Sequence, residues 1–559
     1  MRIKMESKII VWLLVGLLGF GFLWQPGRSE EIVKFSLTKN PELIGNNQSA
    51  KSSEKDTARK NGKTHTGRAL LESAALITGS TINYWRHYAD FQDDWQFKFT
   101  WKDQKRRFFT AESPKFDSNA FWFNWTHAAS GATYYNMART NGLNNRVSFL
   151  FSFGLSTLWE TACEWREIIS INDMVFTSFG GPAIGEPLFQ ISSFFTHKGG
   201  LFNRFLSLVF DPFLPVNNWF DRKKGPAWNS EEDGAADDFS LFLGVRKVSL
   251  SPADQRAVAD SETRYAQFNF GLDMDLFTIP GYLENKSLNS FRWDTLSVNV
   301  FLDFNFSPAG LEEFNIKTKA VLFGYVHQRS YLDGQGQPHG NNFFIGYGTY
   351  FEVYRKRPIA WYDSTLDVPE NGNNLSDARF YNRPTPTEFT DKLSTISPMG
   401  LVFNIGHFQP SFKWQWNTGI YGDFAMVNAL AYNFYSGDHD VSGVKSTLLN
   451  WGYYYAVGIT ISSGVKADWH RWSINGDMAY ESFDSIQGQD RYQFLGVVTE
   501  DFKIHDDLWK WRLKIGYRIP KTPLELALVS ESVKRNGRIL EVNSNYLEHR
   551  LFYQLRLII

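Results

Sequence analysis

The residues best suited to chemistry in this chain are acidic side chains at the end of an apolar segment. The run RVSFLFSFGLSTLW (146–159) leads directly to Glu160 and Glu164, and Asp173 follows after a short polar break. Residues four apart share one face of a helix, so the two glutamates extend a line of serines along that run. If the preceding helix pairs with this one in antiparallel fashion, His127 comes within reach of the acidic end.

Other polar residues extend this candidate cluster. Glu164 and Glu167 are the predicted neighbours of His127, Asn172 stands beside Asp173, and Glu186 lies beyond a glycine turn. Three kinds of site fit the set. Carboxylates and an imidazole could bind a metal, although the Glu-x-x-His repeat of di-iron bundles is absent.

The second possibility is an acid–base site, because carboxylates in apolar surroundings have displaced pKa values and can exchange protons with a histidine. The candidates for such catalysis are His127, Glu160, Glu164 and Asp173. The third is a buried polar network, whose donors would be Tyr134, Arg139, Trp159 and backbone N–H groups. We favour the buried network, and we predict no metal and no cofactor.

Several common signatures of catalysis and binding are missing. The chain contains no phosphate-binding glycine loop, no HExxH, no CxxC and no nucleophile elbow. The single cysteine, Cys163, stands between acidic residues, which favours an unreactive buried thiol. A net charge of −1 gives no reason to expect a nucleic-acid partner.

The N-terminus indicates export from the cytoplasm. Arg2, Lys4 and Lys8 precede an apolar core at 9–24, and a Pro-Gly break follows. This is the three-part pattern of a secretory signal peptide, which we assign to residues 1–29; a single membrane anchor is the alternative. The polar residues 30–65 are predicted to form a disordered leader.

Apolar residues recur at helical spacing from about 66 to 228. This region is predicted to form four or five helices, with the first at 66–87 and a later one opening at Ser170 and interrupted by Pro182 and Gly185. An acidic linker, 229–238, ends the helical module.

The period changes to two after residue 238. Runs such as DTLSVNVFLDFNF alternate apolar and polar side chains over 10 or more residues, and aromatic residues make up 17% of the chain. Strands of this length match an antiparallel transmembrane β-barrel, whose strands need about 10 tilted residues to cross. We predict an α+β membrane protein in which residues 239–559 form a barrel of about 12–14 strands, with 356–392 as a long loop. A polytopic inner-membrane protein is the alternative, but the apolar helical runs are short and carry carboxylates.

Residues of about 120–222 resemble a bacterial family, the domain of unknown function 3943. The resemblance rests on HAASGATYYNMARTNG, SFGLSTLWETACEWRE and SINDMVFTSFGGPAIGE. The matching positions are His127, Gly131, Tyr134, Tyr135, Arg139, Trp159, Glu160, Glu164, Asn172, Asp173, Gly180, Gly181, Gly185 and Glu186. Ala128 stands where the family often has proline. The resemblance implies an exported envelope protein whose barrel follows a helical segment, and it implies no activity.

Two functions from different classes follow from these observations. In the first, the protein is an outer-membrane barrel of a Gram-negative-type bacterium that serves passage, binding or envelope structure. Its helical module plugs the lumen or latches its periplasmic mouth, with the carboxylates facing a polar lumen. In the second, the barrel supports a hydrolase or transferase that acts on envelope lipid through the His, Glu and Asp cluster. The expected partners are outer-membrane lipid and the export and barrel-assembly machinery.

Overall fold

The computed structural model describes most of the chain from residue 64 onward. The described ranges are 64–91, 99–110, 113–117, 121–221, 236–252, 265–308, 310–356, 391–432, 435–436, 439–441, 443–489 and 500–558. The predicted signal peptide (1–29), nearly all of the leader and nearly all of the 356–392 loop lie outside these residues.

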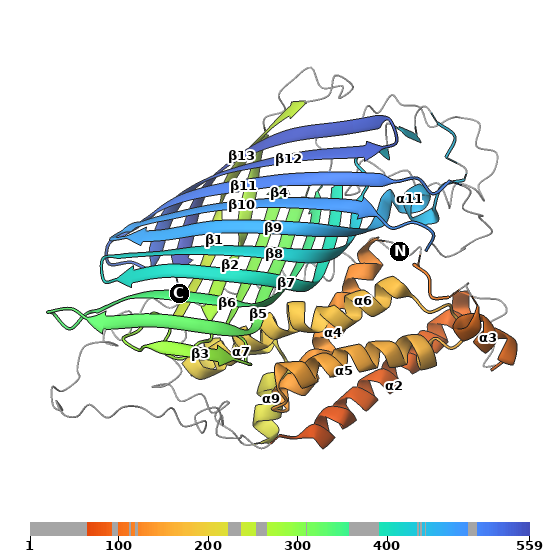
Figure 1. The fold of residues 1–559 in the computed structure, drawn as a ribbon, viewed down its shortest axis with the longest axis horizontal. Coiled ribbons are helices and arrows are strands. Elements are labelled where there is room, and N and C mark those ends of the chain that lie inside the picture. The colour runs from red at the N-terminus through yellow and green to blue at the C-terminus, as the bar shows by residue number, and fades with distance from the viewer. Residues whose placement is uncertain are drawn as a thin grey trace. The chain divides into compact units, whose positions relative to one another are not determined.

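Twelve antiparallel strands of the described ranges close into a barrel, which confirms the predicted fold class (Figure 1). The hydrogen-bonded order runs β5-β4-β2-β1-β13-β12-β11-β10-β9-β8-β7-β6 and returns from β6 to β5. A further short strand, β3, pairs with β5 beside the start of β4. The bounds are β1 Ala236–Pro252, β2 Tyr265–Phe277, β3 Leu288–Arg292, β4 Ser297–Ser307, β5 Gly310–Leu332, β6 Pro338–Lys356, β7 Asp391–Gln409, β8 Phe412–Asn428, β9 Tyr453–Trp469, β10 Trp472–Ser485, β11 Ile504–Arg518, β12 Leu524–Ile539 and β13 Val542–Ile558. Because β1 begins at Ala236, the last residues of the predicted linker belong to the first strand.

The two ends of the barrel carry different connections. At one end, which we call the short-turn end, strands are joined by the turns 333–337, 410–411, 470–471 and 519–523 and by one longer connection, 278–296, which contains β3. At the other, the long-loop end, the connections include 357–390 and 429–452, the second of which contains α11 (Ser446–Trp451).

Bonds between strands that are not neighbours identify the inner face of the wall. Arg550 of β13 bonds to Glu313 of β5, and Lys510 of β11 bonds to Glu352 of β6. Such contacts are possible only across the lumen. Since side chains alternate along a strand, the neighbouring Phe314 points outward.

The helical module contains eight α-helices among the described residues, with two π-helical turns between them. Their bounds are α2 Thr66–Phe91, α3 Trp101–Phe109, α4 Phe121–Thr140, α5 Asn145–Leu158, η1 Trp159–Cys163, α6 Ile171–Gly180, η2 Gly181–Gly185, α7 Glu186–Lys198, α8 Gly200–Phe210 and α9 Phe213–Phe220. None of the helices in the described part of the chain is long and apolar enough to cross a membrane.

Local sequence explains where these helices begin and end, and why there are more of them than the four or five predicted. Asn144 caps α5 by accepting the Val147 N–H at 3.0 Å, and Ser170 caps α6 as predicted. Gly199 and Gly200 adopt positive φ and separate α7 from α8. Pro182 does not end the helix, because the π turn η2 absorbs it and the chain stays helical into α7.

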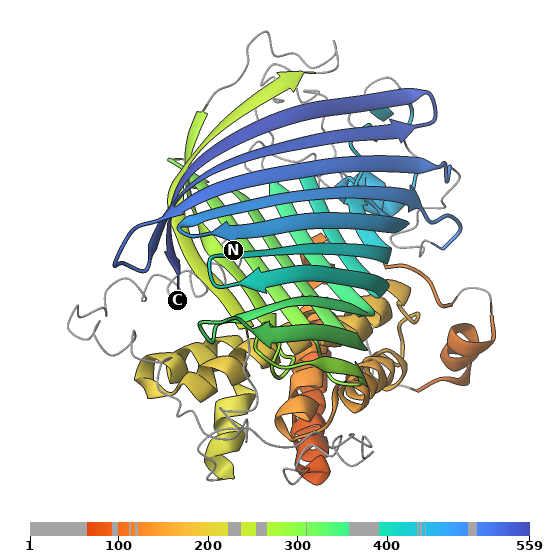
Figure 2. The same ribbon diagram turned by 60° about the vertical axis from the view of Figure 1, so that its left-hand side comes forward.

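The helical module packs against the outer face of the barrel wall. Phe314 belongs to a buried cluster with Phe121 of α4 and Phe176 of α6. The other wall residues of this cluster come from β4 and β6–β9 and are Phe304, Phe351, Val353, Ile396, Phe424, Met426, Tyr453 and Tyr455. Figure 2 shows α-helices along the side of the barrel. The expectation that the module's carboxylates face a polar lumen is therefore wrong, because their barrel partner is an apolar, aromatic outer wall.

Candidate functional site

Two glycines bring the backbones of α4 and α6 into direct contact. A Cβ added to Gly131 would overlap the carbonyl of Thr177, and one added to Gly180 would overlap the backbone of Ala128. Gly185 approaches Ala132 less closely, with 3.0 Å between an added Cβ and the Ala132 carbonyl oxygen. These glycines hold α4 against the continuous α6–η2–α7 helix, so the polar side chains between the helices are shielded from solvent.

Glu186 is the centre of the first polar network in this interface, which we call the Glu186 network. Its carboxylate accepts hydrogen bonds from Tyr135 Oη at 2.7 Å and from Arg139 Nε and Nη2 at 2.7 and 2.9 Å. Gln190 Nε2 donates at 2.6 Å, and Thr295 Oγ1 of the barrel donates at 2.5 Å. Glu186 is fully buried. The network therefore ties α4 and α7 to each other and to the barrel.

A second group, the His127 cluster, lies along the same interface toward the start of α6. It contains His127, Glu160, Asn172, Asp173 and the unpredicted Asp117. His127 Nε2 lies 3.4 Å from Asp173 Oδ1, and Asn172 Nδ2 donates to the same oxygen at 2.8 Å. Asn172 Oδ1 accepts the backbone N–H of Asp117 at 2.9 Å. Glu160 and Asp173 are almost completely buried, whereas 18% of the His127 side chain is exposed.

Arg107 of α3 bonds to the chain beside the His127 cluster, but it donates to backbone carbonyls and not, as Arg139 does at Glu186, to a carboxylate. Its guanidinium donates to the backbone carbonyls of Glu160, Thr161 and Trp165 at 2.6, 3.2 and 2.8 Å. Arg107 thus caps the carbonyls of η1. Sequence analysis missed Arg107 and Asp117; KRRFF reads as an ordinary basic surface, and no spacing links either residue to the motif.

The pKa values of the acids are therefore shifted in opposite directions in the His127 cluster and in the Glu186 network. Burial, followed by the neighbouring acids Glu164 and Asp173, raises the pKa of Glu160 well above its ordinary value. Burial and the charges of Asp117 and Glu164 likewise raise the pKa of Asp173. Burial lowers the pKa of His127 to about 4, against the opposing effect of Asp117. Burial also acts to raise the pKa of Glu186, but the charge and hydrogen bonds of Arg139 outweigh it and hold that pKa below its ordinary value.

Residues 113–213 match the family model described as Domain of unknown function (DUF3943). This confirms the resemblance drawn from the motif, over about the same stretch. No curated protein matches the chain.

The solved structures most like this chain include bacterial outer-membrane barrels. OmpT of Vibrio cholerae is 7% identical, covers 59% of this chain and 98% of its own, and has a TM-score of 0.19. OccK2 (OpdF) of Pseudomonas aeruginosa is 10% identical, with 58% and 100% covered and a TM-score of 0.16. The outer membrane channel DcaP of Acinetobacter baumannii is 11% identical, with 58% and 98% covered and a TM-score of 0.19. The fold assignment rests on the strand pairing of this chain itself.

The remaining DUF3943 motif residues lie around the two groups. Glu164 Oε1 accepts from Trp159 Nε1 at 2.8 Å, and Glu167 bonds to the hydroxyl of Tyr84 in α2. The acidic partner that the structure gives His127 is Asp173 of α6, not one of these two glutamates of the α5 end. Tyr134 packs in a buried cluster that includes Cys163. Gly181 lies against Ser152 and Tyr135.

The chemistry available to the His127 cluster is proton exchange. The neutral imidazole of His127 faces the carboxyl group of Asp173, whose raised pKa favours the protonated form. The backbone N–H of Ser170 orients Glu160, and Asn172 Nδ2 orients Asp173. Within the described ranges, no three His, Cys, Asp or Glu side chains converge in a way that could hold a metal ion.

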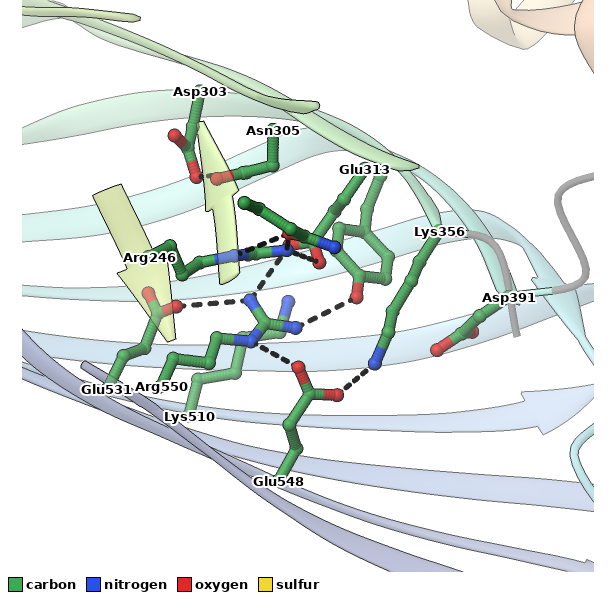
Figure 3. A network of polar contacts seen from close by, with 12 residues as sticks. Arg246, Asp303, Asn305, Glu313, Lys356, Asp391, Lys510, Glu531, Glu548 and Arg550 are labelled. Atoms are coloured by element: carbon green, nitrogen blue, oxygen red, sulfur yellow. Dashed lines mark hydrogen bonds and ion pairs between the residues drawn. The ribbon is translucent and has the colours of Figure 1, made fainter. Parts of the chain in front are cut away.

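The third polar region is inside the barrel. Figure 3 shows Arg550 reaching from β13 to Glu313, Glu531 and Glu548, with N–O distances of 2.8, 3.1 and 2.7 Å. Arg246 bonds to the same Glu313 at 2.9 Å, and Lys356 bonds to Glu548. A neighbouring group joins Lys510 to Glu352 and Glu481 at 3.2 and 2.8 Å. We call these contacts the lumen network; they fill the middle of the barrel with paired charges.

Segments folded inward lie on either side of the lumen network. Toward the short-turn end, Tyr282 packs among inward-facing residues of β5–β8, and its hydroxyl lies 2.7 Å from Asn404 Oδ1. Gln328 Nε2 holds this segment by donating to the carbonyls of Gly281, Glu284 and Lys286. Toward the long-loop end, the residues that pack among inward-facing side chains are Ala429, Ala431, Tyr432, Tyr435 and Leu448.

Proposed function

We propose that this protein is an outer-membrane barrel with a closed lumen, whose outer wall is the platform for the DUF3943 module. The observation that carries the proposal is the lumen network, in which Arg550, Glu313, Lys510 and Glu352 pair across the interior. A conducting pore needs an open aqueous path, whereas paired charges and two inward segments leave the interior of this barrel occupied.

The location follows from the form of the barrel. Outer-membrane barrels have short periplasmic turns and longer external loops. By this rule the short-turn end faces the periplasm of a Gram-negative-type bacterium, and membrane lipid surrounds the exposed part of the wall. The export and barrel-assembly machinery would be needed to bring the chain there.

The test is planar-bilayer conductance of the refolded full-length protein. We expect no steady conductance from the wild type. A double variant, Glu313→Ala with Arg550→Ala, should conduct or flicker, because it removes the central pair of the lumen network and also takes from Arg246 and Glu531 the partners described above. Lys534→Gln, on the exposed outer face of β12, is the matched control and should stay closed.

Two results would overturn this proposal. A steady, ion-selective current through the wild type would make the protein a channel. If the Glu313→Ala/Arg550→Ala barrel folds and stays as silent as the wild type, the lumen network is not what closes it.

One observation favours a second function, a hydrolase or transferase acting on envelope lipid. The pair His127–Asp173 places a neutral imidazole beside a proton-holding acid, and 18% of the His127 side chain is exposed although its Nε2 atom is buried. Vesicles of phosphatidylethanolamine and lipopolysaccharide, incubated with wild type and with His127→Gln, would reveal it by mass spectrometry of the lipids. Products formed by the wild type and lost in His127→Gln would establish the activity; unchanged lipids would exclude it for these two classes.

A further inference from the structure

Several helices of the module bury small polar residues and expose large apolar ones, while aromatic residues such as Phe176 and Phe195 are buried toward the barrel wall. On α2 and α5 the fully buried positions include Ser73, Ser148, Ser152 and Ser156, and α7 buries Ser192 and Ser193. Soluble helices show the opposite pattern, with the apolar stripe facing the core.

The exposed faces of the same helices are apolar. From Leu70 to Ile82, the exposed positions of α2 are Leu70, Leu71, Ala74, Ala75, Thr78, Gly79 and Ile82, without a charged group. Leu71 is 73% exposed. On α5, the exposed positions from Leu150 onward are Leu150, Phe153, Gly154 and Leu158.

Helices α8 and α9 extend this apolar exterior. Five of the 11 residues of α8 are exposed apolar side chains, and they are Leu201, Phe202, Phe205, Leu208 and Val209. Arg204 is the exposed charged residue on this helix, and a long arginine side chain can lie along an apolar surface with its charge at the polar boundary. On α9, Trp219 is 74% exposed and stands beside the exposed Phe220.

The apolar exterior continues onto the barrel wall. Phe195 of α7 packs edge-on against Phe239 of β1, with ring centroids 5.6 Å apart. Leu243 and Val245 follow on the same outward face of β1, and both are more than half exposed. The outer face of a transmembrane barrel touches hydrocarbon, so the module shares a boundary with a lipid-facing surface.

We infer that the exposed faces of α2, α5, α8 and α9 contact membrane lipid, so that the helical module is a polar-cored bundle held against the barrel within the bilayer. This inference rests on the proposed membrane location of the barrel. It favours lipid over a second protein because the apolar surface extends over four helices and runs into the wall. It also explains the acidic side chains in an apolar segment, since a bundle surrounded by lipid must turn its polar groups inward.

The lone cysteine makes a direct test possible. In a Cys163→Ala background, single cysteines replace Leu71, Phe153 or Phe205 and carry an environment-sensitive fluorophore. Leu526→Cys, on the exposed outer face of β12, is the lipid-facing control, and Thr522→Cys, in an exposed short turn, is the water-facing control. The full-length protein is reconstituted in phosphatidylcholine vesicles containing acyl-chain spin-label quenchers, and iodide is added separately.

We expect the three module labels to be quenched by the acyl-chain quencher as strongly as the Leu526 label, within twofold, and to be protected from iodide. Quenching by iodide, as at Thr522, would place the module in water and overturn the inference. Protection from both quenchers would mean that protein covers the face, and would also overturn it. If the Leu526 label itself escapes the acyl-chain quencher, the proposed membrane location fails, and the inference fails with it.

Discussion

The Glu186 network and the His127 cluster both bury acids in the same interface. The first pairs its acid with a guanidinium, whereas the second places several acids together. Glu186 receives five hydrogen bonds, two of them from the guanidinium of Arg139. The carboxylate of Glu160 accepts a hydrogen bond from the backbone N–H of Ser170 at 3.0 Å, and the guanidinium of Arg107 donates to backbone carbonyls. A buried acid with a matched cation stays ionised and holds helices together, whereas one among other acids retains a proton.

Neutralising Glu186 is expected to cause the largest loss of stability. In Glu186→Gln, Arg139 would be left as a buried charge without its carboxylate, which costs about 3–5 kcal/mol. The module should detach from the barrel at lower urea concentration, as measured by hydrogen exchange of α4 and α7. Glu164→Gln is the control, because the Glu164 side chain is half-buried and a glutamine there can still accept the indole N–H of Trp159. Equal losses in the two variants would contradict the special role of Glu186.

A smaller loss is expected from Gly131→Ala. The new methyl group would meet the Thr177 carbonyl and push α4 from α6, at about 1–3 kcal/mol. Gly154→Ala in α5 has open space around the new methyl group and should be neutral or stabilising by up to about 1 kcal/mol. Urea unfolding followed by tryptophan fluorescence would separate them; similar behaviour of the two variants would mean that α4 and α6 are not in close contact.

The third prediction is that neutralising Glu160 increases the stability of the module, whereas Glu186→Gln and Gly131→Ala decrease it. Its pKa is raised in the folded state, so its contribution to stability is full below the unfolded value of 4.5 and is lost as pH rises through the folded pKa. Glu160→Gln should therefore stabilise the module at pH 8 relative to wild type and change little at pH 4. Urea midpoints at the two pH values measure this. Destabilisation at pH 8 would show that the ionised carboxylate is required.

The last prediction concerns the pH dependence contributed by His127. Its folded pKa of about 4 lies below the ordinary 6.5, so the unfolded state binds more protons between these values. Stability should fall as pH drops through that window. His127→Gln should flatten this part of the stability profile, and an unchanged profile would assign the titration to another group.

The fold class could be predicted from the sequence because apolar residues recur with a period of about 3.6 in helices and 2 in strands. Alternation in runs such as that of β4 predicts a strand, and helical spacing with caps such as Ser170 predicts α6. The motif residues Glu186 and Arg139 were also named, and the structure brings them together.

The side of the wall on which the module sits was not predictable. Apolar residues such as Phe304 and Phe351 alternate with polar ones whether lipid or helices cover them. Asp117 was missed because its place in the cluster depends on a bond from β9, where Tyr455 Oη donates to its carbonyl at 2.9 Å. Nothing near either residue in the sequence indicates that pairing.

The bond between Asp117 and Tyr455 also bears on the order in which the module and the barrel can assemble. Asp117 and Tyr455 are 338 residues apart, and the surface that receives the module is built from strands that emerge after it. Contacts between such distant residues form slowly, because a long loop must close before they contribute. Under the proposed export, the helices emerge before the strands, and their apolar faces stay uncovered until the sheet has formed. A chaperone that shields exposed apolar helices would have most to do during this interval.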